Sequence, residues 1–456
     1  MNETTILASA EQRIHHLFLE NGKLLNEAAP AFLRNDREQA MKAFLRMGIP
    51  TRRVENYKYT DLTKLFAQEN YNRAFNPTSF DFDMQEVFTC DVPEFDTHLL
   101  FHVNGWFFSQ NKTDQFPKGI IIKSLKQALK EDAALVEKYY GKIADATKDP
   151  IAALNSCFAQ DGVFIFIPDH IVIDKPIQII NLLRSEEDLY VTQRNLVVVG
   201  KNAQVKLMFC DHTLAVHSYI ANYLTEVYLS EDAVADIYGI QNQHNGTAYL
   251  NALFVRQGKN SQLITNTISL HGGITRNHLQ VELQGEHANA SLFGLTLTDK
   301  DQHSDFFTSI EHAQPSCRSN QIFKNILDDS STGAFTGRIH VMPGAKKTEA
   351  FQRNNSVLMT KAAKMNTKPQ LVIDNDDVKC SHGATIGQVN EEALFYLQTR
   401  GINEEEPRLM LMFAFAHEVL SNIRVEQLRH SIDRLVNKRL RGEVSRCHDC
   451  KLECIR

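Results

Sequence analysis

The sequence predicts a mainly β protein, with a β-solenoid core lying between helical regions at its two ends. Short apolar runs separated by turns fill the chain from about residue 162 to about residue 390. Four turns of similar composition recur there, with first residues 30, 28 and 27 positions apart: 200–203 (GKNA), 230–233 (SEDA), 258–261 (GKNS) and 285–288 (GEHA). A strand, a small-residue turn and a second strand repeating at this period are typical of stacked solenoid coils. A β-sandwich is the alternative, although sandwich turns recur about every 8–12 residues without a long-period likeness.

Apolar positions at helical spacing among charged residues predict two amphipathic helices between about residues 7 and 47. Gly48 and Pro50 end the second helix, because glycine suits the position after a helix and proline pushes the preceding residue out of the α region. We therefore assign residues 1–90 to an N-terminal helical region and residues 91–388 to the β core. The core begins with a mixed segment that extends to about residue 150.

The chain becomes helical again in residues 389–442. Asn390 is a suitable N-cap for a helix that ends near Gly401, and a longer helix follows. That second helix is apolar almost all round, through a set that includes Leu409, Met412, Phe413, Phe415, Val419 and Leu420. Such a helix needs burial on more than one side, either against this chain or against a partner. Residues 443–456 form a cysteine-rich tail.

The composition is that of an ordinary globular chain, with 456 residues, 43% hydrophobic, 23% charged and a net charge of −6. No basic excess indicates nucleic acid, and the apolar run 409–416 is much shorter than the roughly 20 residues that a membrane helix needs. The N-terminus has no basic segment followed by an apolar one. We therefore expect a cytoplasmic protein whose eight cysteines are thiols.

Familiar nucleotide and metalloprotease motifs are missing from the sequence. There is no P-loop, because the Gly-Lys pairs at 200–201 and 258–259 are each followed by Asn. There is also no Gly-x-Gly-x-x-Gly run, and His417-Glu418 lacks the second His of a zinc-binding helix. We expect no nucleotide hydrolysis by this chain itself.

Two groups of residues offer metal ligands. Cys380 and His382 lie two positions apart, so on a strand they face the same side and are able to bind one metal ion. Two ligands do not close a site, so the others would come from elsewhere or from a partner. The alternative is a buried thiol near a hydrogen-bonded histidine.

The tail carries the second group, in the order Cys447, His448, Cys450 and Cys454. Thiolates at this spacing are able to share zinc or iron, or to hold part of an iron–sulfur cluster. The alternative is a mobile chain end with reduced thiols.

Five stretches form a distinctive set: 50–62, 154–162, 335–355, 369–387 and 394–401. Together they closely resemble the SufB/SufD family of iron–sulfur cluster assembly proteins, and the resemblance covers about residues 48–423. The Cys-Ser-His-Gly-Ala-Thr run of residues 380–385 favours the SufD branch, because SufB is expected to carry Glu-Ala-Thr there.

The resemblance implies a right-handed parallel β-helix flanked by helical regions. It also implies pairing with a SufB-like protein through the β-helix and binding of a SufC-like ATPase through the C-terminal helices, about 391–423. A transient iron–sulfur cluster would form at the SufB interface with His382 as a ligand and Cys380 beside it. The chain would be a non-catalytic scaffold, and the resemblance leaves open whether a flavin binds and whether the chain dimerises without SufB.

Two other functions compete with this interpretation. A β-helix carbohydrate-active enzyme would need paired carboxylates along one groove, and the sequence offers no clear pair. A homo-oligomeric scaffold acting without SufB is the other alternative.

Overall fold

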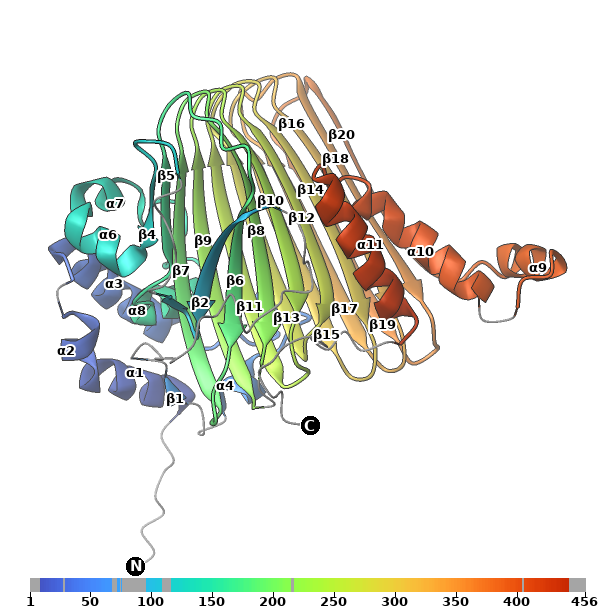
Figure 1. Cartoon of the computed structure of the whole chain (residues 1–456), viewed down its shortest axis with the longest axis horizontal. Coiled ribbons are helices and arrows are strands. Elements are labelled where there is room, and N and C mark those ends of the chain that lie inside the picture. Colours follow the sequence, from blue (N-terminus) through green and yellow to red (C-terminus); the bar gives the residue numbers. More distant parts are fainter. Residues whose placement is uncertain are drawn as a thin grey trace, which may run out of the picture.

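The computed structural model describes residues 9–27, 29–67, 72, 73, 75, 96–108, 116–214, 217–403 and 406–442. Within them, the chain forms a parallel β-solenoid with helices packed at both ends (Figure 1). The predicted solenoid is confirmed, and the sandwich alternative is wrong. Residues 443–456, which contain the predicted tail site, lie outside the described residues.

The solenoid consists of two ten-stranded sheets within the described residues. Sheet A contains β1 (Asn72–Arg73), β4 (Ile121–Ser124), β5 (Val163–Ile167), β7 (Leu189–Val199), β9 (Tyr219–Leu229), β11 (Thr247–Gln257), β13 (Ile274–Leu283), β15 (His303–His312), β17 (Thr332–Val341) and β19 (Lys364–Ile373). Sheet B contains β2 (His98–Val103), β3 (Trp106–Phe107), β6 (Ile177–Leu183), β8 (Gln204–Thr213), β10 (Val234–Asn242), β12 (Gln262–His271), β14 (Asn289–Thr298), β16 (Arg318–Leu327), β18 (Thr348–Leu358) and β20 (Val378–Gln388). From β5 onward, successive strands alternate between the sheets, so each coil adds one strand to each sheet.

The four turns that predicted the repeat form one corner of the solenoid. The third residue of each has a positive φ between 54° and 61°: Asn202, Asp232, Asn260 and His287. Each of these donates its backbone N–H to a carbonyl of the next coil, as Asp232 does to Lys259 at 2.8 Å. The fourth residue is small and fully buried, as Ala203 and Ala288 are. Cys317 occupies the equivalent place one coil later, so its burial follows from the repeat.

The solenoid interior changes from apolar to polar along each coil. Aliphatic side chains such as Val197, Leu207 and Val227 fill one part of the space between the sheets. Buried polar side chains fill another part and bond to one another. Asp211, for example, accepts hydrogen bonds from Asn181 Nδ2 and Tyr249 Oη, both at 2.8 Å.

The N-terminal helices cover the outer face of sheet A near its first strands. They are α1 (Ala10–Glu20), α2 (Gly22–Leu25), α3 (Ala31–Met47), α6 (Leu125–Glu131), α7 (Ala133–Tyr139) and α8 (Pro150–Phe158). All nine residues of α8 are buried. A fully buried ion pair joins this layer to the sheet, because Glu226 on β9 pairs with Arg194 and also accepts backbone N–H groups from Gly141, Ile143 and Ala144.

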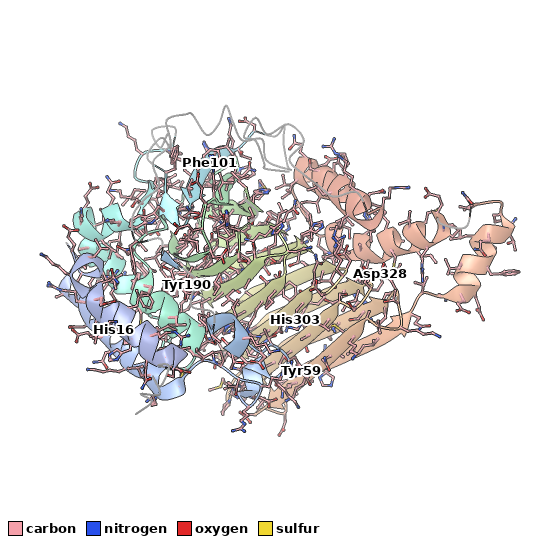
Figure 2. All side chains as sticks on the ribbon, turned by 90° about the horizontal axis from the view of Figure 1, so that it is seen from below. His16, Tyr59, Phe101, Tyr190, His303 and Asp328 are labelled. Carbon is pink, nitrogen blue, oxygen red and sulfur yellow. The ribbon has the colours of Figure 1, made fainter. Side chains whose placement is uncertain are left out.

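Residues 51–67, here termed the N-terminal strap, run across the outer face of sheet A and contain η1 (Glu55–Tyr57) and α4 (Thr63–Ala67). At one end Phe66 packs on Tyr190 of β7, and at the other Glu55 pairs with Lys368 of β19. Between them, Thr60 Oγ1 lies 2.9 Å from Nε2 of His303 on β15. Figure 2 labels Tyr59 of the strap and His303, and shows the strap against the sheet A strands. The strap therefore spans coils from the first part of the solenoid to the last.

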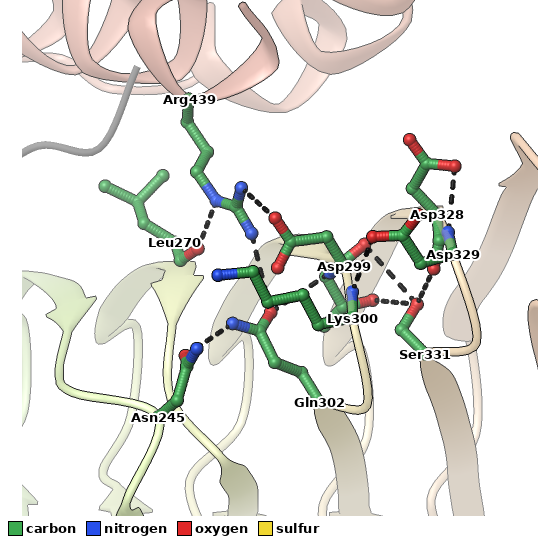
Figure 3. A network of polar contacts seen from close by, with 10 residues as sticks. Asn245, Leu270, Asp299, Lys300, Gln302, Asp328, Asp329, Ser331 and Arg439 are labelled. Carbon is green, nitrogen blue, oxygen red and sulfur yellow. Dashed lines mark hydrogen bonds and ion pairs between the residues drawn. The ribbon is translucent and has the colours of Figure 1, made fainter. Parts of the chain in front are cut away.

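The C-terminal helices are α9 (Glu391–Thr399), α10 (Glu406–Leu420) and α11 (Glu426–Leu440). Helices α10 and α11 cover the outer face of sheet B, where α10 is anchored by an Asn266 Nδ2 bond to the Val419 carbonyl at 3.0 Å. Arg439 of α11 donates to the Leu270 carbonyl at 2.8 Å and pairs with Asp299 at 2.7 Å (Figure 3). Helix α9 projects away from the solenoid (Figure 1), and none of its residues is buried.

Most of the element predictions agree with the structure. Gly48 ends α3 with a φ of 70°, and the Asn390 side chain caps α9 by accepting from the Ala393 N–H at 3.0 Å. The expected N-terminal helices are present, with the short α2 between them. No helix in the described part of the chain is long and apolar enough to cross a membrane.

Candidate functional site at the open end of the solenoid

The last coil leaves one end of the solenoid uncovered. Strands β19 and β20 each end their sheet, so each keeps an unpaired backbone edge. Side chains that would be buried in an inner coil are exposed here, including Ile373 at 41% and Ile386 at 44%. An exposed edge beside exposed apolar side chains is a surface that favours pairing with another chain.

Cys380 and His382 lie on β20 and face the solenoid interior. In the register between β18 and β20, Cys380 pairs with Ala350 and His382 pairs with Gln352. Ala350 and Gln352 are buried between the sheets, so the two candidate ligands continue interior columns into the last coil. Cys380 is half-buried, whereas His382 is exposed at the open end.

The chemistry of this pair suits a shared metal or cluster. Two side chains two positions apart on a strand are separated by about 6.5 Å along it, which is within reach of one cluster. Burial raises the pKa of the Cys380 thiol, so it is a thiol in the free chain and loses a proton on binding metal. Among the described residues, no group of three or more His, Cys, Asp or Glu side chains is placed to hold a metal ion. The site is therefore incomplete within the described part of this chain.

Gln352 pairs with His382 in the register of β18 and β20, and no sequence motif singles it out. Its side chain is 1% exposed, and neither amide atom has a hydrogen-bond partner. Its amide reaches across the interior to Gly337 on β17, where an added Cβ would lie 2.2 Å from Nε2. The alternation of side chains along β18 is sufficient to place Gln352 on the same face as Ala350. It does not show which face of the strand points inward.

The predicted docking residues on α10 divide into two groups. Met412, Val419 and Leu420 are buried within this chain, against α11 and sheet B. Leu409, Phe413 and Phe415 are half-buried. The most exposed large apolar residues of this region are others, namely Phe395 at 68%, Tyr396 at 56% and Met410 at 47%.

The other cysteines in the described residues are part of the protein core. Cys157, Cys210 and Cys317 are buried and form no disulfide within the described residues, as expected for cysteines that pack as small apolar side chains. Cys90 and the four tail residues Cys447, His448, Cys450 and Cys454 lie outside the described residues.

Family models match almost the whole chain. Residues 182–415 match the SufBD core domain of the SUF system for iron–sulfur cluster assembly, and residues 8–179 match the SufBD N-terminal region. The class of protein is thus that of iron–sulfur cluster assembly proteins. The chain belongs to the SufBD family.

Individual relatives agree with this assignment over nearly their full lengths. The iron–sulfur cluster assembly protein SufD of Escherichia coli is 28% identical over 447 residues, which cover 95% of this chain and 98% of the relative. A SufBD family protein of Synechocystis sp. is 28% identical over 431 residues, covering 92% and 94%. A SufBD family protein of Staphylococcus epidermidis is 23% identical over 459 residues, covering 97% and 96%.

Proposed function

We propose that this chain is a SufD-like scaffold subunit that pairs with a SufB-like protein through the open end of its solenoid. The observation that carries the proposal is the position of Cys380 and His382 on the inner face of the last strand. A partner that adds a strand to β19 or β20 would cover the exposed apolar residues and bring its own ligands to the same place. The incomplete site of this chain would then become part of a complete one.

In this complex, His382 contributes an imidazole nitrogen to a nascent iron–sulfur cluster, and the Cys380 thiolate lies beside it. The cluster is cargo, built at the interface and passed on, so a weak or incomplete ligand set in either chain favours its release. The chain itself performs no catalysis and works in the cytoplasm. A flavin is not required by any residue in this proposal.

A SufC-like ATPase would dock on the face formed by α9 and the outer side of α10. Phe395, Tyr396 and Met410 are exposed there, and Leu409 and Phe413 are half-buried beside them. Helix α9 begins at Glu391, three residues after β20 ends at Gln388. Dimerisation of the ATPase on nucleotide binding would therefore pull on the strand that carries the ligands, and so couple ATP hydrolysis to the interface.

The ligand role is tested by His382→Ala in a complex co-expressed with SufB-like and SufC-like proteins. We expect normal assembly and a large loss of iron and sulfide in the purified complex. Ser381→Ala is the matched control, because Ser381 lies on the outer face of the same strand. An unchanged cluster yield in His382→Ala would refute the role, and failure of the unmodified chain to bind a SufB-like protein would favour a homo-oligomeric scaffold.

The docking face is tested by the double variant Phe395→Ala with Tyr396→Ala. We expect it to lose the SufC-like ATPase in a pull-down while it keeps the SufB-like protein. Leu19→Ala on α1 is the control, because Leu19 is comparably exposed, at 62%, but lies at the other end of the chain. Equal recovery of the ATPase with both variants would contradict this assignment.

We further propose that Cys447, His448, Cys450 and Cys454 bind iron or zinc. The support is their spacing in the sequence, which suits soft metal ions. Metal content of the full chain is compared with that of a chain ending at Ser445. Equal content after purification without added metal would rule out the tail site.

A further inference from the structure

The carboxamide of Gln352 is buried between the two sheets, and it has no hydrogen-bond partner there. Both of its polar atoms are unpaired, although the side chain is 1% exposed. One coil further in, Gln321 occupies the same column, and its carboxamide oxygen accepts a hydrogen bond from Thr308 Oγ1 at 2.7 Å, although its amide nitrogen is also unpaired. The inner glutamine thus has one partner, whereas the outer one has none.

The opposite sheet provides room for this side chain. Gly337 faces Gln352 across the interior, and a Cβ there would lie 2.2 Å from the amide nitrogen. Because Gly337 has no side chain, the carboxamide is able to lie against its backbone between the sheets. A buried polar group that is left unpaired costs stability, so its presence calls for a role that the free chain does not display.

The neighbour of Gln352 toward the open end is His382, one strand away on the same face. Side chains of the same column in adjacent parallel strands stack at about 4.8 Å, which a rotation of the glutamine is able to bridge. His382 makes no hydrogen bond or ion pair to any described residue. A histidine that binds metal through one ring nitrogen nearly always donates the other ring N–H to an acceptor, which fixes the ring and raises its basicity.

We infer that Gln352 is a positioning residue for His382, with its carboxamide oxygen accepting the ring N–H that does not face the cluster. This inference rests on the proposed ligand role of His382. In the free chain the amide lies against Gly337, and in the loaded site it turns toward the imidazole. The interaction fixes which nitrogen of His382 binds iron, and it satisfies the buried amide at the same time.

The test uses the full chain co-expressed with SufB-like and SufC-like partners, with iron and sulfide reconstituted on the complex. Gln352→Leu keeps the volume of the side chain but cannot accept a hydrogen bond. Loss of such an outer partner weakens metal binding by about 10- to 100-fold, so we expect a chelator to remove iron at least about tenfold faster. The urea midpoint of the free chain should not fall, because the substitution removes two unpaired buried atoms.

Two further variants separate positioning from packing. Gln321→Leu is the matched control in the next coil, and it should leave the rate of iron removal unchanged. Gln352→Glu restores an acceptor and should return the rate toward that of the unmodified complex. Equal rates for Gln352→Leu and Gln321→Leu, with His382→Ala still defective, would overturn this inference alone. An unaffected His382→Ala complex would instead overturn the proposed function, and this inference with it.

Discussion

Asp211 should make the stability of this protein fall as the pH rises through the weakly acidic range. Its carboxylate is buried between the sheets, and its hydrogen bonds from Asn181 and Tyr249 only partly offset the loss of water. Burial raises its pKa from the ordinary value of 3.8 to about 6. The folded chain therefore holds this proton more tightly than the unfolded chain does.

The sign and size of the effect follow from that difference. Stability from protonated Asp211 is fully present below pH 3.8 and is lost as the pH rises to about 6 and slightly above. A difference of about two pKa units corresponds to roughly 3 kcal/mol, and nearly half of it falls above pH 5. Asp211→Asn removes this dependence, because an amide is neutral throughout and is able to bond to both neighbours.

Urea unfolding of the two proteins between pH 5 and pH 8 measures this directly. The chain has a single tryptophan, the buried Trp106, whose fluorescence reports unfolding near the same end of sheet B. Relative to Asp211→Asn, the unmodified chain should lose about 1 kcal/mol across this range. Asp376→Asn, on an exposed turn, is the control. A pH-independent difference between the unmodified chain and Asp211→Asn would refute the reasoning.

Three other substitutions test the contacts that hold the layers together. Arg194→Met leaves Glu226 as an uncompensated buried charge and should lower the free energy of unfolding by about 3–5 kcal/mol. A loss under 1 kcal/mol in urea unfolding would contradict the assignment of Arg194 and Glu226 as a buried ion pair. Gly162→Ala places a Cβ 1.9 Å from the backbone oxygen of Arg194. The free energy of unfolding should therefore fall by about 1–3 kcal/mol or more in the same assay. An unchanged urea midpoint would show that the backbone at these two positions can move apart. Arg439→Ala should lower the melting temperature more than Arg441→Ala does. The ion pair of Arg441 is about 40% exposed, and such pairs contribute about 1 kcal/mol or less. Equal shifts in calorimetry would count against the anchoring role of Arg439.

The solenoid was predictable because the turns at one corner have a recurring residue pattern, which can be recognised without knowing where the strands are. A turn that needs a positive φ favours Asn, Asp or Gly, and the buried residue after it must be small, so the repeat was visible at residues 200–203 and in the turns after it. The strands were harder to predict. Only residues 196–199 of β7 were identified, because Gln193, Arg194 and Asn195 are polar although they are buried. They are compatible with a strand only because residues of neighbouring coils pair with them, as Thr225 does with Asn195 at 3.1 Å and Glu226 does with Arg194.

The candidate site was predictable in part for similar reasons. The spacing of Cys380 and His382 was sufficient to place them on one face of a strand. The sequence could not show that this face points inward, nor that the strand belongs to the last coil. On α10, a helix that is apolar all round gave no means of separating Met412, which is covered by this chain, from Met410, which is exposed. Burial at such positions depends on which elements meet in space.

The N-terminal strap changes how a stack of coils should respond to force and heat. In an ordinary solenoid each coil contacts only its neighbours, so the end coils fray first and independently. Here Glu55 ties the last coil to the same segment that anchors on Tyr190 near the first coils. The strap therefore opposes fraying of the coil that carries Cys380 and His382, although its other anchor lies many coils away. The strap works as a longitudinal brace, and it links the end of the solenoid that carries Cys380 and His382 to the segment that follows the N-terminal helices.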